Sequence, residues 1–237
     1  MIFTDQVKAD ILIHAAREYP RECCGLIIIR RGRQTYFPGR NISAGGSHFV
    51  LDPQDYADAE AQGAIAAVVH SHPDGTPDPS GVDLMACEAS SLPWLIVSYP
   101  GKEWHEIQPA NYSPPLIGRQ FQHGVQDCYA LVRDWYAQEM NLQLPDFSRE
   151  DDWWHKGQNL YLDNFAACGF TEITAADLQR GDALLMAIVS PVPCHAAVYL
   201  GNEMIIHHRQ GRLSCREPLT GSYLNRTTHY LRYNGSL

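Results

Sequence analysis

Two histidines and one aspartate in the first half of the chain have the residue types and spacing of a zinc site. His70 and His72 lie two residues apart at the end of an apolar segment that we expect to form a strand. Side chains alternate between faces along a strand, so both imidazoles should point the same way. The proline-rich loop 73–79 leads to Ser80 at an expected helix start, with Asp83 on the first turn. Two His and one Asp would hold Zn²⁺ and leave its fourth position to water, as catalytic zinc sites require.

Two more side chains have the chemistry that such a site needs. Glu22 stands at the mouth of the first expected strand, where its carboxylate can act as general base toward the water. The Ser80 hydroxyl can donate a hydrogen bond to a developing oxyanion. Simpler interpretations remain open, because a His-x-His pair often has no ligand and Ser80 with Asp83 also has the spacing of a helix capping pair.

A second group of residues, in the other half of the chain, suits a cysteine nucleophile. Asp127 is a natural N-cap, so Cys128 falls on the first turn of an expected helix, where the positive helix end should lower the thiol pKa. His195 opens one expected strand and His207 ends the next, so pairing of the strands would let His195 act as base and His207 fix its tautomer. His208 is the alternative to His207, and a buried cysteine is more often a packing residue.

The elements that must position these residues alternate in kind, which predicts an α+β fold class. Periodicity and capping signals predict helices over 5–18, 52–62, from 80 onward, and 127–140, and strands over 24–29, 64–70, 93–99, 183–188, 195–200 and 203–208. The segment 146–169 is rich in Asp and Trp and gives no clear pattern. The second half should therefore run helix first and sheet after.

A proline-rich stretch separates the two groups of candidate residues. Residues 108–115 hold three prolines, which disfavour both a helix and strand pairing. We therefore expect a first domain over 1–107, a linker over 108–115 and a second domain over 116–237.

The composition limits the class of protein. Hydrophobic residues make up 45% and charged residues 19%, as in a soluble globular protein. The net charge is -9 and both halves are acidic, which argues against nucleic-acid binding. No apolar run approaches the roughly 18 residues of a membrane span, and no secretory signal is visible. Seven cysteines at irregular spacings fit reduced thiols in a cytoplasm.

The first group of residues resembles the JAMM motif of the Mov34/MPN/PAD-1 metallopeptidases, over about residues 5–107. The match consists of Glu22 in a Pro-x-Glu-x-Cys-Gly context, His70-Ser-His72-Pro, a seven-residue gap to Ser80 and a two-residue gap to Asp83. The resemblance implies a JAMM/MPN-type α/β domain with one zinc ion on His70, His72 and Asp83. It also implies Glu22 as base, Ser80 supporting the intermediate, and cleavage of isopeptide or peptide bonds, usually of ubiquitin-like proteins.

The second group resembles the NlpC/P60 cysteine peptidases, over about residues 116–237. The matching strings are Asp127-Cys128-Tyr-Ala-Leu-Val, Leu178-Gln-Arg-Gly-Asp182 and His195-Ala-Ala-Val-Tyr-Leu-Gly201. The resemblance implies a papain-like α+β domain with Cys128 as nucleophile, His195 as base and His207 as orienting residue. The implied substrate is the stem peptide of bacterial peptidoglycan.

Two positions depart from the NlpC/P60 pattern. Tyr129 follows the cysteine where family members commonly have Ser or Asn, and the stretch 117–123 lacks the tyrosine that many members carry upstream. The origin of the oxyanion contacts is therefore left open.

The pairing of both domains in one chain is similar to that in tail tip assembly proteins of lambda-like tailed phages. This resemblance implies other phage tail tip proteins as partners, and the host cytoplasm during assembly, or the virion tail tip, as location. Two functions remain open: an active hydrolase, and a non-catalytic assembly factor whose peptidase domains serve as docking modules. The sequence favours the first, because the expected ligands and the Cys/His/His set are all present.

Overall fold

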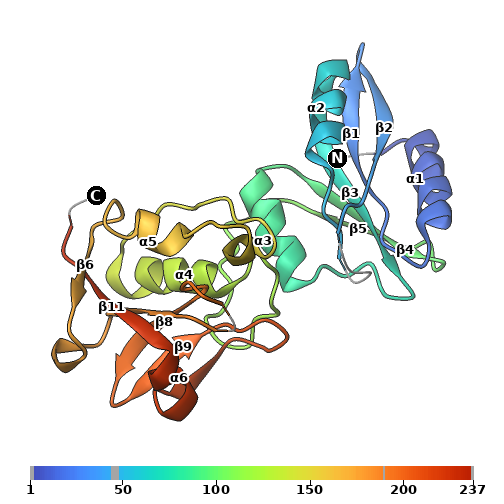
Figure 1. Ribbon diagram of the computed structural model, residues 1–237. Helices are drawn as coiled ribbons and strands as arrows, with labels where there is room; N and C mark the ends of the chain where they lie inside the picture. The colour runs from blue at the N-terminus through green and yellow to red at the C-terminus, as the bar shows by residue number, and fades with distance from the viewer. Residues whose placement is uncertain (1–2, 44–47, 189, 236–237) are drawn as a thin grey trace. The chain divides into compact units, whose positions relative to one another are not determined.

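The computed structural model describes residues 3–43, 48–188 and 190–235, and the chain divides into two compact units, Met1–Ser113 and Pro114–Leu237 (Figure 1). The division lies inside the proline-rich stretch 108–115. Each unit combines helices with a single sheet and has its own core, so the predicted α+β class is confirmed.

The first unit is a five-stranded sheet with strand order β2-β1-β3-β4-β5. Its elements are α1 (Asp5–Glu18), β1 (Cys24–Arg30), β2 (Arg33–Gly39), α2 (Pro53–Gln62), β3 (Ala64–Pro73), α3 (Gly81–Ser90), β4 (Trp94–Tyr99) and β5 (Trp104–Ile107). Strands β3 and β4 run parallel, and the other neighbours are antiparallel. The parallel pair needs a crossover, and α3 with the loop before it supplies that connection.

Helices cover both faces of this sheet because its central strands are apolar on both sides. Alternate residues of β1 and β3 enter two different clusters: Ile27 packs with Val7 and Ile11 of α1, whereas Leu26 packs with Ala59 of α2 and with α3. The helix starts agree with the predictions, since Thr4 caps α1, Asp52 caps α2 and Ser80 caps α3.

The second unit begins with a helix and ends in a six-stranded antiparallel sheet of order β10-β9-β8-β7-β11-β6, as the helix-first prediction requires. Its elements are α4 (Cys128–Met140), α5 (Leu160–Asn164), β6 (Phe170–Ile173), β7 (Ala183–Met186), β8 (His195–Gly201), β9 (Met204–His207), β10 (Cys215–Pro218), α6 (Gly221–Arg226) and β11 (Thr227–Tyr233). Two short 3-10 turns lie at Trp153–His155 and Ala175–Asp177. Helix α4 buries Leu131 and Trp135 against the core of this sheet.

The sequence-based prediction missed five strands, namely β2, β5, β6, β10 and β11, and the two short helices α5 and α6. Four of these strands are the outermost ones of the two sheets. Edge strands carry many exposed polar residues, so they lack the apolar signal of a central strand. Strand β3 also runs three residues beyond its predicted end at His70, to Pro73.

The unassigned segment 146–169 is held in place by a buried arginine. Arg149 donates to the Asp127 carboxylate, to Asp146, and to the backbone carbonyls of Gly124 and Phe147. These bonds tie an otherwise irregular stretch to the start of α4. Because the Arg149 contacts come from a side chain and not from regular backbone pairing, no periodic pattern marks them in the sequence.

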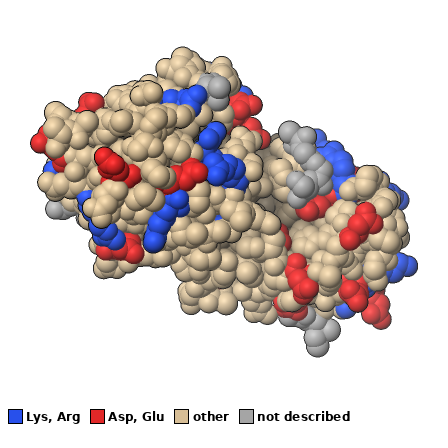
Figure 2. All heavy atoms as spheres, turned by 90° about the horizontal axis from the view of Figure 1, so that it is seen from below, with Lys and Arg blue, Asp and Glu red and all other residues tan. Residues whose placement is uncertain are grey.

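On the surface, each unit carries both signs of charge. In the view of Figure 2, Lys and Arg side chains are interspersed with Asp and Glu side chains. No helix among the described residues combines the length and the apolar character needed to cross a membrane. All seven cysteines are free thiols.

Candidate functional site

In the first unit, β3 and α3 bring the three predicted metal ligands together. His70 Nε2 lies 3.0 Å from His72 Nε2 and 3.2 Å from Asp83 Oδ1, and His72 Nε2 lies 3.5 Å from Asp83 Oδ2. Alternation along β3 places both imidazoles on one side, and the first turn of α3 supplies the carboxylate. The three side chains therefore converge on one point.

The geometry and the protonation of these groups fit a zinc ion. Zn²⁺ binds N and O ligands at about 2.0–2.2 Å, which places tetrahedral ligand atoms about 3.3 Å apart. His72 Nδ1 donates to the Thr76 carbonyl over 2.9 Å, so in the neutral imidazole the lone pair is on Nε2. The only proton left among the facing atoms is then the one that His70 Nε2 can carry, and both His72 Nε2 and the Asp83 carboxylate are acceptors. A cation satisfies this donor set better than a proton does.

Electrostatics keep the aspartate ionised and the buried histidine neutral. Burial raises the pKa of Asp83, but hydrogen bonds from His70, His72 and Ser80 lower it more strongly, well below its usual range. Burial lowers the pKa of His70, which is fully buried, despite the opposing effect of Asp83. A carboxylate and a neutral imidazole are the forms in which these side chains bind metal.

Ser80 aims the aspartate at the histidines. Its hydroxyl accepts from Asp83 N over 3.1 Å, while Ser80 N donates to Asp83 Oδ2 over 2.7 Å. The interpretation of these two residues as a capping box is thus confirmed. Because the hydroxyl only accepts in this contact, its own proton remains available to another group.

Glu22 lies two residues before the start of β1, close enough to His72 and Asp83 to feel their charges. Burial raises the pKa of its carboxyl group to about 7, with His72 lowering it and Asp83 raising it further. Its backbone is anchored, because Asn41 donates to the Glu22 carbonyl over 3.0 Å and Cys23 N donates to the Ser71 hydroxyl over 2.9 Å. A carboxyl group that titrates near neutrality can both take up and release a proton.

In the second unit, α4 begins at Cys128, and the cysteine lines a cleft. Asp127 caps the helix by accepting from Ala130 N over 2.9 Å, as predicted. The cleft has a volume of about 500 Å³ and also contains His195. Other residues lining it include His123, Asp152, Trp153, Trp154, Tyr161 and Arg209.

The two predicted histidines of this unit meet across neighbouring strands. His195 Nε2 lies 3.0 Å from His207 Nδ1, and the antiparallel register of β8 and β9 pairs Ala197 with His207. His208, the alternative partner, packs instead edge-on against Phe121, with ring centroids 5.1 Å apart. The structure thus brings His207, and not His208, to His195.

Two contacts of this site were missed in the sequence. The Glu217 carboxylate lies 2.9 Å from His207 Nε2, on the unpredicted strand β10. The Tyr161 hydroxyl of α5 lies 3.2 Å from Cys128 Sγ, whereas the Tyr129 hydroxyl donates to the Pro145 carbonyl. A tyrosine therefore reaches the sulfur from downstream of the cysteine. Recognising β10 as a strand would have suggested Glu217, two residues after the cross-strand partner of His207.

The expectation of a lowered thiol pKa is wrong for this structure. Burial, and next the charge of Asp127, raise the pKa of Cys128 to about 11, against hydrogen bonds from Tyr161 and from the Ala196 N–H. Burial also holds the pKa of His195 well below its ordinary value. The cap carboxylate sits at the helix end that was expected to favour the thiolate. A neutral thiol beside a neutral imidazole is therefore the favoured resting pair.

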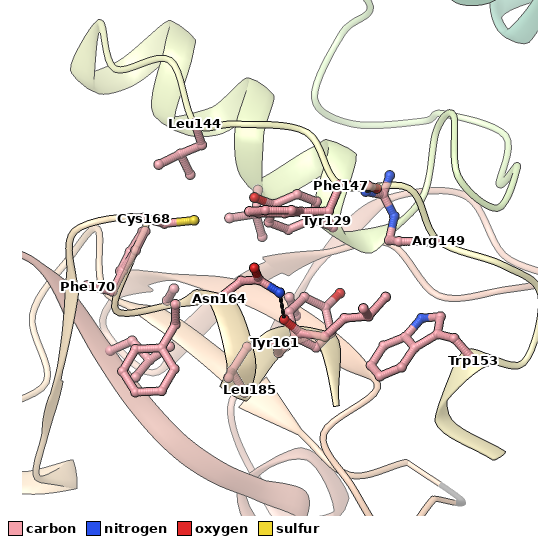
Figure 3. A pocket seen from close by; sticks show the side chains of 16 residues that line it. Tyr129, Leu144, Phe147, Arg149, Trp153, Tyr161, Asn164, Cys168, Phe170 and Leu185 are labelled. Atoms are coloured by element: carbon pink, nitrogen blue, oxygen red, sulfur yellow. Dashed lines mark hydrogen bonds between the residues drawn. The ribbon is translucent and has the colours of Figure 1, made fainter. Parts of the chain in front are cut away.

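A second, apolar pocket adjoins the cleft (Figure 3). Arg149, Trp153 and Tyr161 line both. Beyond them the pocket continues among core side chains such as Leu144 and Phe170, which belong to the hydrophobic cluster under α4. The side chain that contacts the cysteine sulfur is thus supported from behind by the core.

Comparison with known proteins supports both motif-based resemblances. The profile of prokaryotic homologs of the JAB domain matches residues 4–108, and that of the NlpC/P60 family matches residues 118–232. The chain is 41% identical over 226 residues to tail tip assembly protein K of Escherichia phage N15, covering 94% of this chain and 92% of that protein. It is 44% identical over 183 residues to tail tip assembly protein K of Escherichia phage lambda, covering 77% and 89%.

Among solved structures, the NlpC/p60 domain of the peptidoglycan hydrolase SagA is 16% identical, with a TM-score of 0.36, over 49% of this chain and 89% of that one. The alignment to the phage N15 protein covers 94% of the chain and therefore includes both units and the junction between them. The chain therefore belongs to the family of tail tip assembly proteins K, with a JAB-like domain followed by an NlpC/P60 domain.

Proposed function

We propose that this chain acts in phage tail tip assembly and carries two peptidase sites, a zinc-dependent one in the first domain and a thiol peptidase in the second. The observation that carries the proposal is the contact of His195 with His207 in the cleft that holds Cys128. The names of the two phage relatives support the assembly role and other tail tip proteins as partners.

In the second domain, Cys128 Sγ would attack the carbonyl carbon of a peptidoglycan stem peptide. As the S–C bond forms, the thiol proton passes to His195, which then gives it to the amine released when the C–N bond breaks. Water hydrolyses the resulting thioester and restores the thiol. Since the resting pair is neutral, the attack requires the Cys128 proton to be transferred to His195 in the course of the reaction and does not start from a resting thiolate.

Digestion of muropeptides by the purified chain tests this site. We expect new amino termini, detected by mass spectrometry, and their loss in Cys128→Ser and His195→Ala. Cys87→Ser is the control, because Cys87 is a buried thiol on α3 of the first domain whose Sγ donates to the Leu92 carbonyl. If the wild-type chain releases no new termini from several peptidoglycan types, the thiol peptidase proposal fails.

In the first domain, His70, His72 and Asp83 would hold the metal. The chemistry that Zn²⁺ supplies when bound is Lewis acidity, which lowers the pKa of water and polarises a carbonyl. Glu22 would take up a proton and later pass it to the leaving amine, and the Ser80 hydroxyl would donate to the developing oxyanion. The scissile bond is a peptide or isopeptide bond.

Glu22→Gln tests the role of the base. The amide keeps the shape of the side chain but does not accept the proton, so bound zinc should stay while peptidase activity falls about 100-fold or more. Metal analysis and turnover are measured on the same preparation. Wild-type protein without zinc, or unchanged turnover in the variant, contradicts the proposal.

A second function, a non-catalytic assembly factor, is favoured by one observation. The Cys128 thiol is buried, and its pKa is raised to about 11, as for a packing cysteine. Complementation of tail assembly with a chain that carries Cys128→Ser and Glu22→Gln separates the two functions. We expect tails to assemble in the host cytoplasm and the resulting particles to infect poorly; full infectivity would favour the assembly factor.

A further inference from the structure

Three polar side chains form a row on one face of the second sheet. His207 is on β9, and its cross-strand partner Cys215 is on β10, so Glu217, two residues later, shares the face. His195 lies on the same face of β8, two residues before the cross-strand partner of His207. Glu217 Oε2 contacts His207 Nε2 over 2.9 Å, and His207 Nδ1 contacts His195 Nε2 over 3.0 Å.

Hydrogen-bond directions along this row follow from its last member. A carboxylate only accepts, so His207 Nε2 must carry the proton that it shares with Glu217. A neutral imidazole has one N–H, so His207 Nδ1 is bare and accepts from His195 Nε2. By the same rule the proton of His195 is on Nε2, and its Nδ1 carries a lone pair. That nitrogen is then the one free to accept the thiol proton.

Glu217 is held as an ionised acceptor. Tyr223 donates its hydroxyl proton to Oε2, and Arg212 Nη2 lies 3.0 Å from Oε1. Partial burial alone would raise the pKa of Glu217. The hydrogen bonds from Tyr223 and His207 outweigh it, so the pKa lies below its ordinary value. The Tyr223 ring packs edge-on against His207, with centroids 4.8 Å apart, and limits how the imidazole can turn.

We propose that Glu217 is a positioning residue of the thiol site, which through His207 fixes the tautomer of His195 so that Nδ1 is the proton acceptor. This inference rests on the proposed thiol peptidase for its consequence, but the tautomers themselves can be measured without any substrate. Nitrogen-15 chemical shifts of the histidine rings distinguish a protonated from a bare ring nitrogen at each position.

The experiment uses the full chain labelled on histidine, with signals assigned from His195→Ala and His207→Ala. In wild type we expect both rings protonated on Nε2 at neutral pH. In Glu217→Ala the acceptor is lost, so His207 should redistribute its proton between the two nitrogens, and His195 with it. Lytic kcat should fall about 10-fold to 100-fold, as for other residues that orient a functional histidine, with KM nearly unchanged.

Two variants separate the acceptor from a merely structural role. In Glu217→Gln, two donors face the Oε2 position, so the amide oxygen should take it and keep the wild-type tautomers with a smaller loss of kcat. Arg212→Gln removes the ion pair but leaves the acceptor, so the ring shifts should not move. A simple structural role for Glu217 predicts instead that activity falls with loss of folded signals and that Gln does not rescue it.

The outcomes decide the proposal even when a variant does not fold. A wild-type His207 protonated on Nδ1, or Glu217→Ala with unchanged ring shifts, overturns it. Wild-type shifts as expected but no lytic activity in the wild-type chain overturns the proposed peptidase and leaves the tautomer assignment supported. If Glu217→Ala is insoluble, the wild-type shifts and those of Glu217→Gln still give the answer.

Discussion

Each domain contains two histidines whose ring nitrogens lie 3.0 Å apart, with a carboxylate beside them, but the two groups are connected differently. In the first domain the contact joins Nε2 to Nε2, and Asp83 contacts both rings. His70, His72 and Asp83 thus surround one position and form a cage, which suits a cation. Both histidines come from the same strand, two residues apart, so they share one direction.

In the second domain the contact joins Nε2 of His195 to Nδ1 of His207, and Glu217 contacts only the outer ring. His195, His207 and Glu217 lie on three neighbouring strands, and their hydrogen bonds form a line and not a cage. In such a line, the acceptor at one end fixes which ring nitrogen of each histidine carries the proton. This arrangement suits control of the tautomer of a base. Strand placement, and not residue type, therefore decides between the two kinds of chemistry.

The comparison predicts its largest effect at the inner end of the line. Cys128→Ala and His195→Ala should each lower lytic activity by about 10⁴-fold or more, because nucleophile and base act as one unit. The double variant should lose no more than either single one. Kinetics on a defined stem peptide measure this. Losses that multiply in the double variant would mean that the two residues act separately.

The next effect should appear in the cage, where removal of one ligand disables the whole site. His72→Ala should lose zinc, together with the about 4 kcal/mol of stabilisation that a ligand provides at 1,000 times its Kd. A chelator should do the same to wild type and leave lytic activity of the second domain unchanged. Metal analysis and urea unfolding followed domain by domain test both statements. Chelator-sensitive lysis would instead mean that the thiol site depends on the metal of the first domain.

The cage was predictable from the sequence, but the line was predictable only in part. His70, His72, Ser80 and Asp83 lie within fourteen residues, and local rules for strands, loops and caps place them. His195 and His207 are joined by one hairpin, so their pairing also followed from local structure. Choosing His207 over His208 required the register, which the sequence left open.

Contacts from distant or weakly patterned segments were the ones missed. Glu217 lies on an edge strand with alternating exposure, and Tyr161 belongs to a five-residue helix inside a segment without periodicity. The prediction of a lowered thiol pKa for Cys128 was wrong for a related reason. Position on a helix shows the direction of the dipole, whereas burial depends on what folds over the residue.

A smaller effect is expected at the middle of the line. His207→Ala should retain some lytic activity, about 10-fold to 100-fold below wild type. We expect this because the proposed role of His207 is to orient the base and not to contact the substrate carbonyl. His207→Gln, whose amide oxygen can accept from His195 Nε2, should recover part of the loss. Complete inactivity of His207→Ala in a folded protein would assign this residue a direct role in proton transfer.

The smallest effect vanishes at neutral pH and appears in acid. Burial is the first cause that lowers the pKa values of His195, His207 and His208, to about 4 for His208. These folded-state pKa values lie below those of the unfolded chain, so the unfolded state binds more protons between about pH 6.5 and pH 4. The stability of the second domain should therefore be complete above that window and fall, as the pH drops through it, by on the order of 1 kcal/mol per pH unit for each titrating histidine. The stability of His208→Phe should depend less on pH within this window, since phenylalanine does not titrate. Urea unfolding followed by amide exchange of β8 and β9 peptides measures both slopes, and equal slopes in the two proteins would show that His208 is not the group responsible.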